Sequence, residues 1–293
     1  MFLLWALLAL QATTGTALER ALERLSEEAE LFLSNVKTAI GTETLEQRAL
    51  APPPRFRPRF GAAAEKPPEE KWQTRRIVSE YAYAAFASGP DAVHEFRTVR
   101  TVDGREVRRV EKARALLAQG VTSPDDRLRH QMLRDFEKHG LVGAVTDFGQ
   151  TILLFRRTQL TNYRFTPAGR ERVGADEAMK VVFTQRGGGQ AITIFEGSRA
   201  VRRPLEGIVW LRAGDLLPLR VTLVAERDEE GRRLRDEGTV EYRQGATGAL
   251  LPASVVHRQW LNGKMVVENR YTYTGFRRFA AESEIKFEEE KPQ

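Results

Sequence analysis

The chain has 293 residues, of which 41% are hydrophobic and 29% charged, and its formal net charge is +6. This composition excludes a wholly disordered protein, and the length allows one large domain or two modest ones with an ample core. The absence of cysteine excludes disulfides, thiolate metal sites and a cysteine nucleophile.

The N-terminus begins with an apolar run, Met1 to Leu10, and continues in small residues that end at Ala17. This pattern predicts a signal peptide over residues 1–17, because the run is too short to span a bilayer as a helix. No Lys or Arg precedes the run, so a buried helix is the alternative. The expected location is periplasmic or secreted, and nothing after the signal peptide is expected to be transmembrane.

Residues 18–39 carry apolar side chains at steps of three and four, which predicts an amphipathic helix ending before Gly41. Thr42 to Leu50 alternates loosely and is compatible with a strand. Residues 51–70 are rich in proline, which excludes helix and predicts an exposed loop. The alternative for this loop is a docking segment for a protein partner.

Two kinds of element are predicted next. Residues 71–110 show β patterns, and Asp103-Gly104 predicts a type I′ hairpin turn. A helix is predicted from an N-cap at Ser123, with Pro124 in its first turn and Gly140 at its end. A second helix is predicted over 147–160, with Asp147 as its N-cap.

The region 160–280 is dominated by period-two alternation, as in Leu217, Leu219, Val221 and Leu223. Such alternation predicts strands with one buried and one solvated face. Short turn segments, including Asn262-Gly263, separate the strands and predict an antiparallel meander. The predicted strands cover 162–167, 177–186, 191–195, 205–212, 217–228, 232–244, 250–261 and 264–279.

Several short motifs resemble catalytic signatures, but each has a simpler structural interpretation. Asp147-Phe148-Gly149 spells the metal-binding triplet of kinases, but no glycine-rich nucleotide loop or His-Arg-Asp loop accompanies it. Gly187 to Gly189 precedes a β-like segment and is interpreted as a hairpin turn, not a phosphate loop. Paired carboxylates fall at helix starts and turn tips, where solvent prevents the pKa separation that acid–base catalysis needs.

The four histidines show no metal-ligand spacing, so no metal and no cofactor is predicted. The basic excess is dispersed among acidic residues, so no nucleic-acid partner is expected. A hydrolase of envelope polymers remains an alternative, and it would require His94 or His257 in a cleft beside a carboxylate.

The segment Arg203-Pro204-Leu205-Glu206-Gly207-Ile208-Val209-Trp210-Leu211, followed by Leu217-Pro218-Leu219-Arg220-Val221, resembles the LolA/RseB-like superfamily of periplasmic lipoprotein carriers. The resemblance covers roughly residues 160–280. It implies a curved antiparallel sheet closed by helices over an apolar cavity, and a role in carrying or sensing lipid-modified proteins.

The expectation is therefore a single α+β domain over 18–293, with a large curved antiparallel β-sheet, a half-barrel, and helices packed on its concave face. The expected function is non-enzymatic binding in the bacterial envelope, with an acyl chain or a lipidated protein in an apolar cavity. The alternative is an interaction protein with a filled core. The residues predicted to line the cavity are Val209, Leu211, Leu219, Val221, Tyr242, Tyr271 and Tyr273.

Overall fold

The computed structural model describes most of the chain. The ranges are 2–51, 70–85, 93–122, 126–142, 147–186, 193–196, 199–202, 205–229, 231–245 and 248–278. Most of the proline-rich loop, the Ser123-Pro124 helix start and the Gly187 to Gly189 turn lie outside the described residues, so these three predictions stay predictions.

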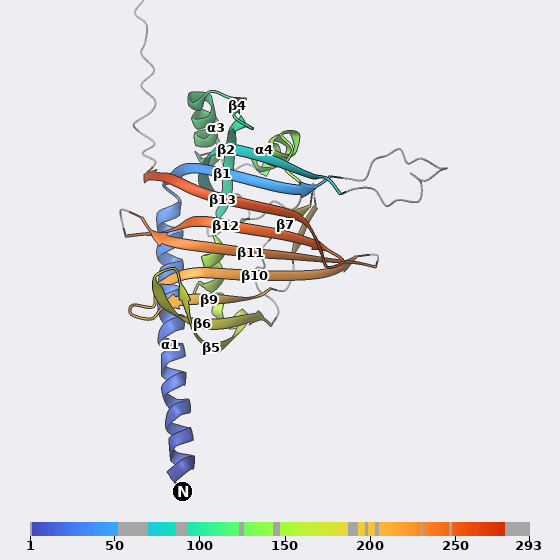
Figure 1. The fold of residues 1–293 in the computed structure, drawn as a ribbon. Helices are drawn as coiled ribbons and strands as arrows, with labels where there is room; N and C mark the ends of the chain where they lie inside the picture. Colours follow the sequence, from blue (N-terminus) through green and yellow to red (C-terminus); the bar gives the residue numbers. More distant parts are fainter. Residues whose placement is uncertain are drawn as a thin grey trace, which may run out of the picture.

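One curved, antiparallel sheet of eleven strands forms the body of the molecule (Figure 1). Across the sheet the strands are β4 (Arg105–Glu106), β3 (Val93–Val102), β2 (Trp72–Ala85), β1 (Ala39–Leu50), β13 (Lys264–Arg278), β12 (Leu250–Leu261), β11 (Arg232–Gln244), β10 (Pro218–Glu229), β9 (Glu206–Arg212), β6 (Asp176–Gln185) and β5 (Tyr163–Val173). The predicted fold class, an α+β protein with a large curved antiparallel sheet that forms a half-barrel, is confirmed.

The strand order corrects the prediction of a simple meander in two places. Strands β9 to β13 are sequential neighbours, but β13 then pairs with β1 from the other end of the chain. Strands β6 and β9 pair with each other, and β7 (Thr193–Glu196) and β8 (Arg199–Arg202) form a separate hairpin between them in sequence. Local alternation defines each strand but carries no information about these long-range partners.

The concave face is built from aligned rows of side chains. One row crosses eight strands through paired positions, and each of its members is at most 5% exposed. Its members are Val181, Val209, Val221, Val240, Val255, Tyr271, Leu45 and Ile77. Burial of each aliphatic side chain in such a row contributes about 1.5–3 kcal/mol, so this face is the main source of stability.

The first helix, α1 (Phe2–Val36), runs across the strands and covers this face (Figure 1). Leu25, Ala29 and Val36 are fully buried, as the predicted amphipathic pattern requires. Phe32 meets the rings of Tyr83 on β2 and Tyr242 on β11, with ring centroids 5.7 and 6.4 Å apart. The helix also includes most of the predicted signal peptide, whose cleavage after Ala17 stays a prediction.

Two further helices pack beside β3. Helix α3 (Val110–Thr122) contacts β2 and β3, and α4 (Asp126–Lys138) contacts β3. Arg114 of α3 lies 3.5 Å from Glu80, which alternation places on the face of β2 opposite to Tyr81. Helix α3 therefore covers the other face of these two strands. None of the helices in the described part of the chain is long and apolar enough to cross a membrane.

The predicted second helix over 147–160 is wrong. This segment forms two short 3-10 turns, η1 (Thr151–Phe155) and η2 (Leu160–Asn162), and the N-cap of η1 is Gln150. Ile152 and Phe155 of η1 are fully buried beneath α1. Contacts with the sheet, described below, replace the local hydrogen bonds that a regular helix would need.

Candidate functional site

A cluster of charged side chains is buried in the concave face where β1, β2, β3 and β13 meet. The Nε atom of Arg97 donates to both carboxylate oxygens of Glu43 at 2.8 and 2.9 Å, and its Nη2 donates to Glu95 at 2.5 Å. The side chains of all three are at most 3% exposed. The guanidinium also lies over the rings of Tyr81 and Tyr271. Two carboxylates therefore share one cation away from water.

This arrangement changes the acidity of both carboxyl groups. The pKa of Glu95 is raised to about 7, mainly by burial and in addition by the negative charges of Asp147 and Glu43, while the charge of Arg97 acts in the opposite direction. Burial also raises the pKa of Glu43, again against the effect of Arg97. The cause in both is the cost of placing an ionised carboxylate in a low-dielectric interior.

The raised pKa of Glu95 predicts a specific dependence of stability on pH. The folded protein holds this proton more tightly than the unfolded chain, whose glutamate has a pKa near 4.5. The free energy of unfolding should therefore fall by about 3 kcal/mol as pH rises from about 4.5 to above 7. Urea unfolding of wild type and Glu95→Gln at several pH values measures this. The difference in the free energy of unfolding between the wild type and the variant should change across that pH range. A difference that is the same at every pH would contradict the prediction.

The Asp147-Phe148-Gly149 triplet is fastened to the concave face by each of its residues. Asp147 is not a helix N-cap: its carboxylate lies 2.6 Å from His94 Nδ1 and accepts the backbone N–H of Glu95 at 3.1 Å. The N–H of Gly149 donates to Glu95 at 2.7 Å.

A tyrosine of β11 holds the same segment from the other end. The Tyr242 hydroxyl donates to the Gly149 carbonyl at 3.2 Å and accepts the Ile152 N–H at 2.9 Å. The triplet thus anchors a segment that fills the hollow of the sheet.

Phe148 occupies a notch that a glycine provides. A Cβ atom on Gly238 would lie 2.4 Å from the Phe148 ring, so only glycine leaves room for it. The ring also lies 5.0 Å from the imidazole of His257, centroid to centroid, and His257 is the residue that pairs with Gly238 on the next strand. His257 is fully buried, and hydrogen bonds connect it to Asp236 at 3.1 Å and to Asn269 at 3.4 Å. The interior at this point is closely packed.

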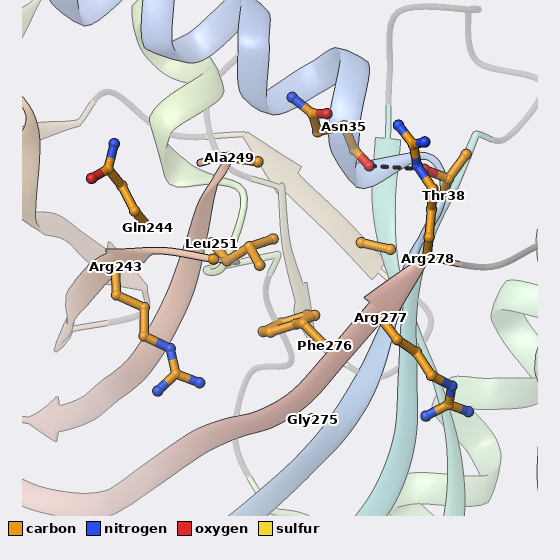
Figure 2. A pocket seen from close by; sticks show the side chains of 12 residues that line it. Asn35, Thr38, Arg243, Gln244, Ala249, Leu251, Gly275, Phe276, Arg277 and Arg278 are labelled. Carbon is orange, nitrogen blue, oxygen red and sulfur yellow. Dashed lines mark hydrogen bonds between the residues drawn. The ribbon is translucent and has the colours of Figure 1, made fainter. Parts of the chain in front are cut away.

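An open pocket lies at one end of the concave face. It has a volume of about 420 Å³ and is bounded by the end of α1, the turn between β11 and β12, and the end of β13 (Figure 2). Leu251 and Phe276 form its apolar part. We call this cavity the end pocket.

The shape of the end pocket depends on a bulge in β13. Thr42 pairs with Thr274 and Ile40 pairs with Arg277, so Gly275 and Phe276 together face Gly41. Gly275 has a positive φ of 64°, which is the backbone that such a bulge requires. Phe276 then stacks on Tyr273 with ring centroids 6.4 Å apart. A Cβ atom on Gly41 would lie 3.0 Å from the Phe276 ring, so this glycine makes room for it.

Three arginines also line the pocket, namely Arg243, Arg277 and Arg278, and Figure 2 shows the side chain of Arg277 extending away from Phe276. Their side chains are exposed, and no carboxylate belongs to the residues that line the pocket. Arg243 donates to the backbone carbonyl of Tyr273 at 3.0 Å. Neither Arg277 nor Arg278 has an ion-pair partner among the described residues. The pocket therefore combines an apolar surface with uncompensated positive charge.

The structure places the seven predicted lining residues as follows. Six lie in the main core, and Leu219 lies in a separate small cluster with Ala178 and Trp210. None of the seven belongs to the end pocket, although Tyr273 stacks directly behind Phe276. The arginines were not singled out from the sequence. Their signal is the pair Arg277-Arg278, which follows an aromatic residue at the end of a strand.

Both histidines named for a hydrolase lie beside an aspartate, His94 next to Asp147 and His257 next to Asp236. His257 is enclosed by the core, and both of its ring nitrogens are engaged. Asp147 uses its second oxygen to hold the backbone of Glu95. These pairs attach segments of the chain to each other, and neither histidine lines the end pocket.

Comparison with protein-family models and with curated proteins gave no match. Solved structures of the LolA superfamily are among those that match. One is a LolA superfamily protein from Nitrosomonas europaea, with 10% identity, a TM-score of 0.33, and coverage of 88% of this chain and 93% of that one.

Two further matches have similar values. A DUF1329 family protein from Desulfovibrio piger has 9% identity and a TM-score of 0.38, and covers 89% of this chain and 92% of that one. A putative outer membrane lipoprotein-sorting protein domain from Vibrio parahaemolyticus has 11% identity and a TM-score of 0.32, with the same coverage. Solved structures of the superfamily named from the sequence are therefore among the matches, at 9–11% identity.

Proposed function

We propose that the chain is a non-enzymatic binding protein of the bacterial envelope, and that its end pocket holds an anionic amphiphile. The ligand class is an acyl chain with an acidic head group, either free or attached to a protein. The observation that carries the proposal is the presence of Arg243, Arg277 and Arg278 in the same pocket lining as Leu251 and Phe276, with no carboxylate in that lining.

Size and charge both support this ligand class. A volume of about 420 Å³ lies within the range of small-molecule sites, which is roughly 300–1,000 Å³. Arginine binds carboxylate and phosphate through paired hydrogen bonds, and such charge-assisted bonds contribute about 1.5–3 kcal/mol each. The apolar part of the pocket provides the burial that an alkyl chain needs.

Fluorescence titration of the delipidated protein with a dansyl-labelled medium-chain fatty acid tests the proposal. We expect saturable binding in the micromolar range. The Arg277→Gln/Arg278→Gln variant should bind about tenfold more weakly, because a charge-assisted contact is lost. A neutral amide of the same probe should bind the wild type about as weakly as the acid binds the variant.

Arg170→Gln/Arg172→Gln is the matched control. It removes the same two charges from exposed positions of β5, away from the pocket, and should bind like the wild type. No uptake of the probe by the wild type at micromolar concentration, or equal loss in the control variant, would sink the proposal.

A second candidate function is that of an interaction protein without a small ligand. Its support is the filled interior, in which Phe148, Ile152 and Phe155 occupy the hollow that a buried ligand would need. Under this alternative a sheet edge or the proline-rich loop meets a protein partner. Absence of fatty-acid binding together with a retained partner in pull-downs from envelope extracts would favour it.

A further inference from the structure

A second cavity, of about 350 Å³, lies between α3, α4 and β3 and shares no residue with the end pocket. We call it the α3–α4 groove. Its apolar floor consists of Phe96, Leu116 and Met132. The floor is fixed to the sheet, because the sulfur of Met132 accepts the backbone N–H of Arg97 at 3.1 Å.

Two cations of this groove form no ion pair with any of the residues that the structure describes. Arg134 and Lys138 are four residues apart on α4, both are exposed, and both line the groove. Like charges at this spacing repel each other across one helical turn. Neither side chain has an ion-pair or hydrogen-bond partner among the described residues. The helix thus presents two exposed cations, without ion-pair partners among the described residues, at the edge of a cavity.

The acidic residue of the groove is already engaged. Asp135 lies 3.2 Å from Nη1 of Arg108, which also donates to the carbonyl of Val99 at 2.8 Å. The imidazole of His139 lies 3.6 Å from the same carboxylate. Asp135 therefore neutralises Arg108 and is not free to compensate Arg134 and Lys138.

We propose that the α3–α4 groove is a second binding site, for an organic anion with a compact apolar body. A phosphate-like group would lie between Arg134 and Lys138, and the apolar body would lie on Phe96, Leu116 and Met132. Attraction between opposite charges is stronger beside an apolar floor than in open water, and binding of the anion removes the repulsion between the two cations. This site does not depend on the function proposed for the end pocket.

Titration with phenyl phosphate, followed by amide chemical shifts of the full chain, tests this inference. We expect saturable shifts concentrated in the segments 96–98, 116–119 and 131–138. Arg134→Gln/Lys138→Gln should weaken binding at least about tenfold. Arg109→Gln/Lys112→Gln is the control. It removes the same charge from exposed positions at the start of α3 that do not line the groove, and this variant should bind like the wild type.

Two reference compounds separate the parts of the site. Phenol, which lacks the charge, and inorganic phosphate, which lacks the apolar body, should each bind at least about tenfold more weakly than phenyl phosphate. Equal binding of inorganic phosphate, unchanged binding by the groove variant, or equal loss in the control would overturn the proposal. The melting temperature of the groove variant without ligand should stay close to that of the wild type, because both substituted side chains are exposed.

Discussion

Gly149→Ala should lower the free energy of unfolding by about 3 kcal/mol, one of the two largest effects that we expect from a single substitution. A Cβ atom at this position would lie 2.5 Å from the carboxylate of Glu95 and 2.9 Å from the hydroxyls of both Tyr81 and Tyr83. These three side chains are at most 1% exposed and have no space into which to move. The substitution would also disturb the hydrogen bond from the Gly149 N–H to Glu95.

Thermal and urea unfolding measure this effect. For a chain of this size the melting temperature should fall by roughly 6–12 °C. Gly214→Ala is the control, because nothing lies within 4 Å of a Cβ atom at that turn position. It should change stability by no more than about 0.5 kcal/mol. A Gly149→Ala protein as stable as the control would show that residues 147–149 are not held against the sheet as described.

Arg97→Met should destabilise the protein by about 3–5 kcal/mol at neutral pH, because it leaves Glu43 and Glu95 buried without their cation. The loss should shrink at low pH. Protonation of the two carboxyl groups removes the buried charges, and in the variant their pKa values would be higher still without Arg97. Urea unfolding at pH 5 and at pH 8 measures both parts of this expectation.

Two further variants make the Arg97 experiment decisive. Adding Glu43→Gln and Glu95→Gln to Arg97→Met should restore much of the lost stability, since the unpaired charges are then gone. Arg235→Met removes an arginine that forms two ion pairs on the sheet surface, and should cost about 1 kcal/mol or less. Equal costs for Arg97→Met and Arg235→Met would contradict the buried cluster.

The strands from β9 to β13 agree closely with the sequence-based prediction, because period-two alternation and turn chemistry are both local. Asp103-Gly104 and Asn262-Gly263 adopt the positive φ values that a type I′ turn needs. Helix α3 was missed. Its buried face has only Ala113 and Leu117 as fully covered apolar residues, which is a weak periodic signal.

The centre of the molecule depends on contacts that no local pattern contains. Glu95 and Arg97 alternate with Val93 and Val99 on one face of β3, so their inward position is visible in the sequence. Glu43, the second carboxylate that binds Arg97, is more than fifty residues away from it and enters only through the order of the strands. The helix predicted over 147–160 failed for the same reason, because bonds to the sheet determine the backbone there.

The pairing of β1 with β13 has a consequence for how the chain folds during its synthesis. These two strands meet near the middle of the sheet, yet they are separated by most of the polypeptide. During synthesis β1 has no partner on this side until β13 has emerged, so the two halves of the sheet cannot be joined earlier. A chain shortened before Lys264 would leave two open edges in place of one continuous sheet and should aggregate.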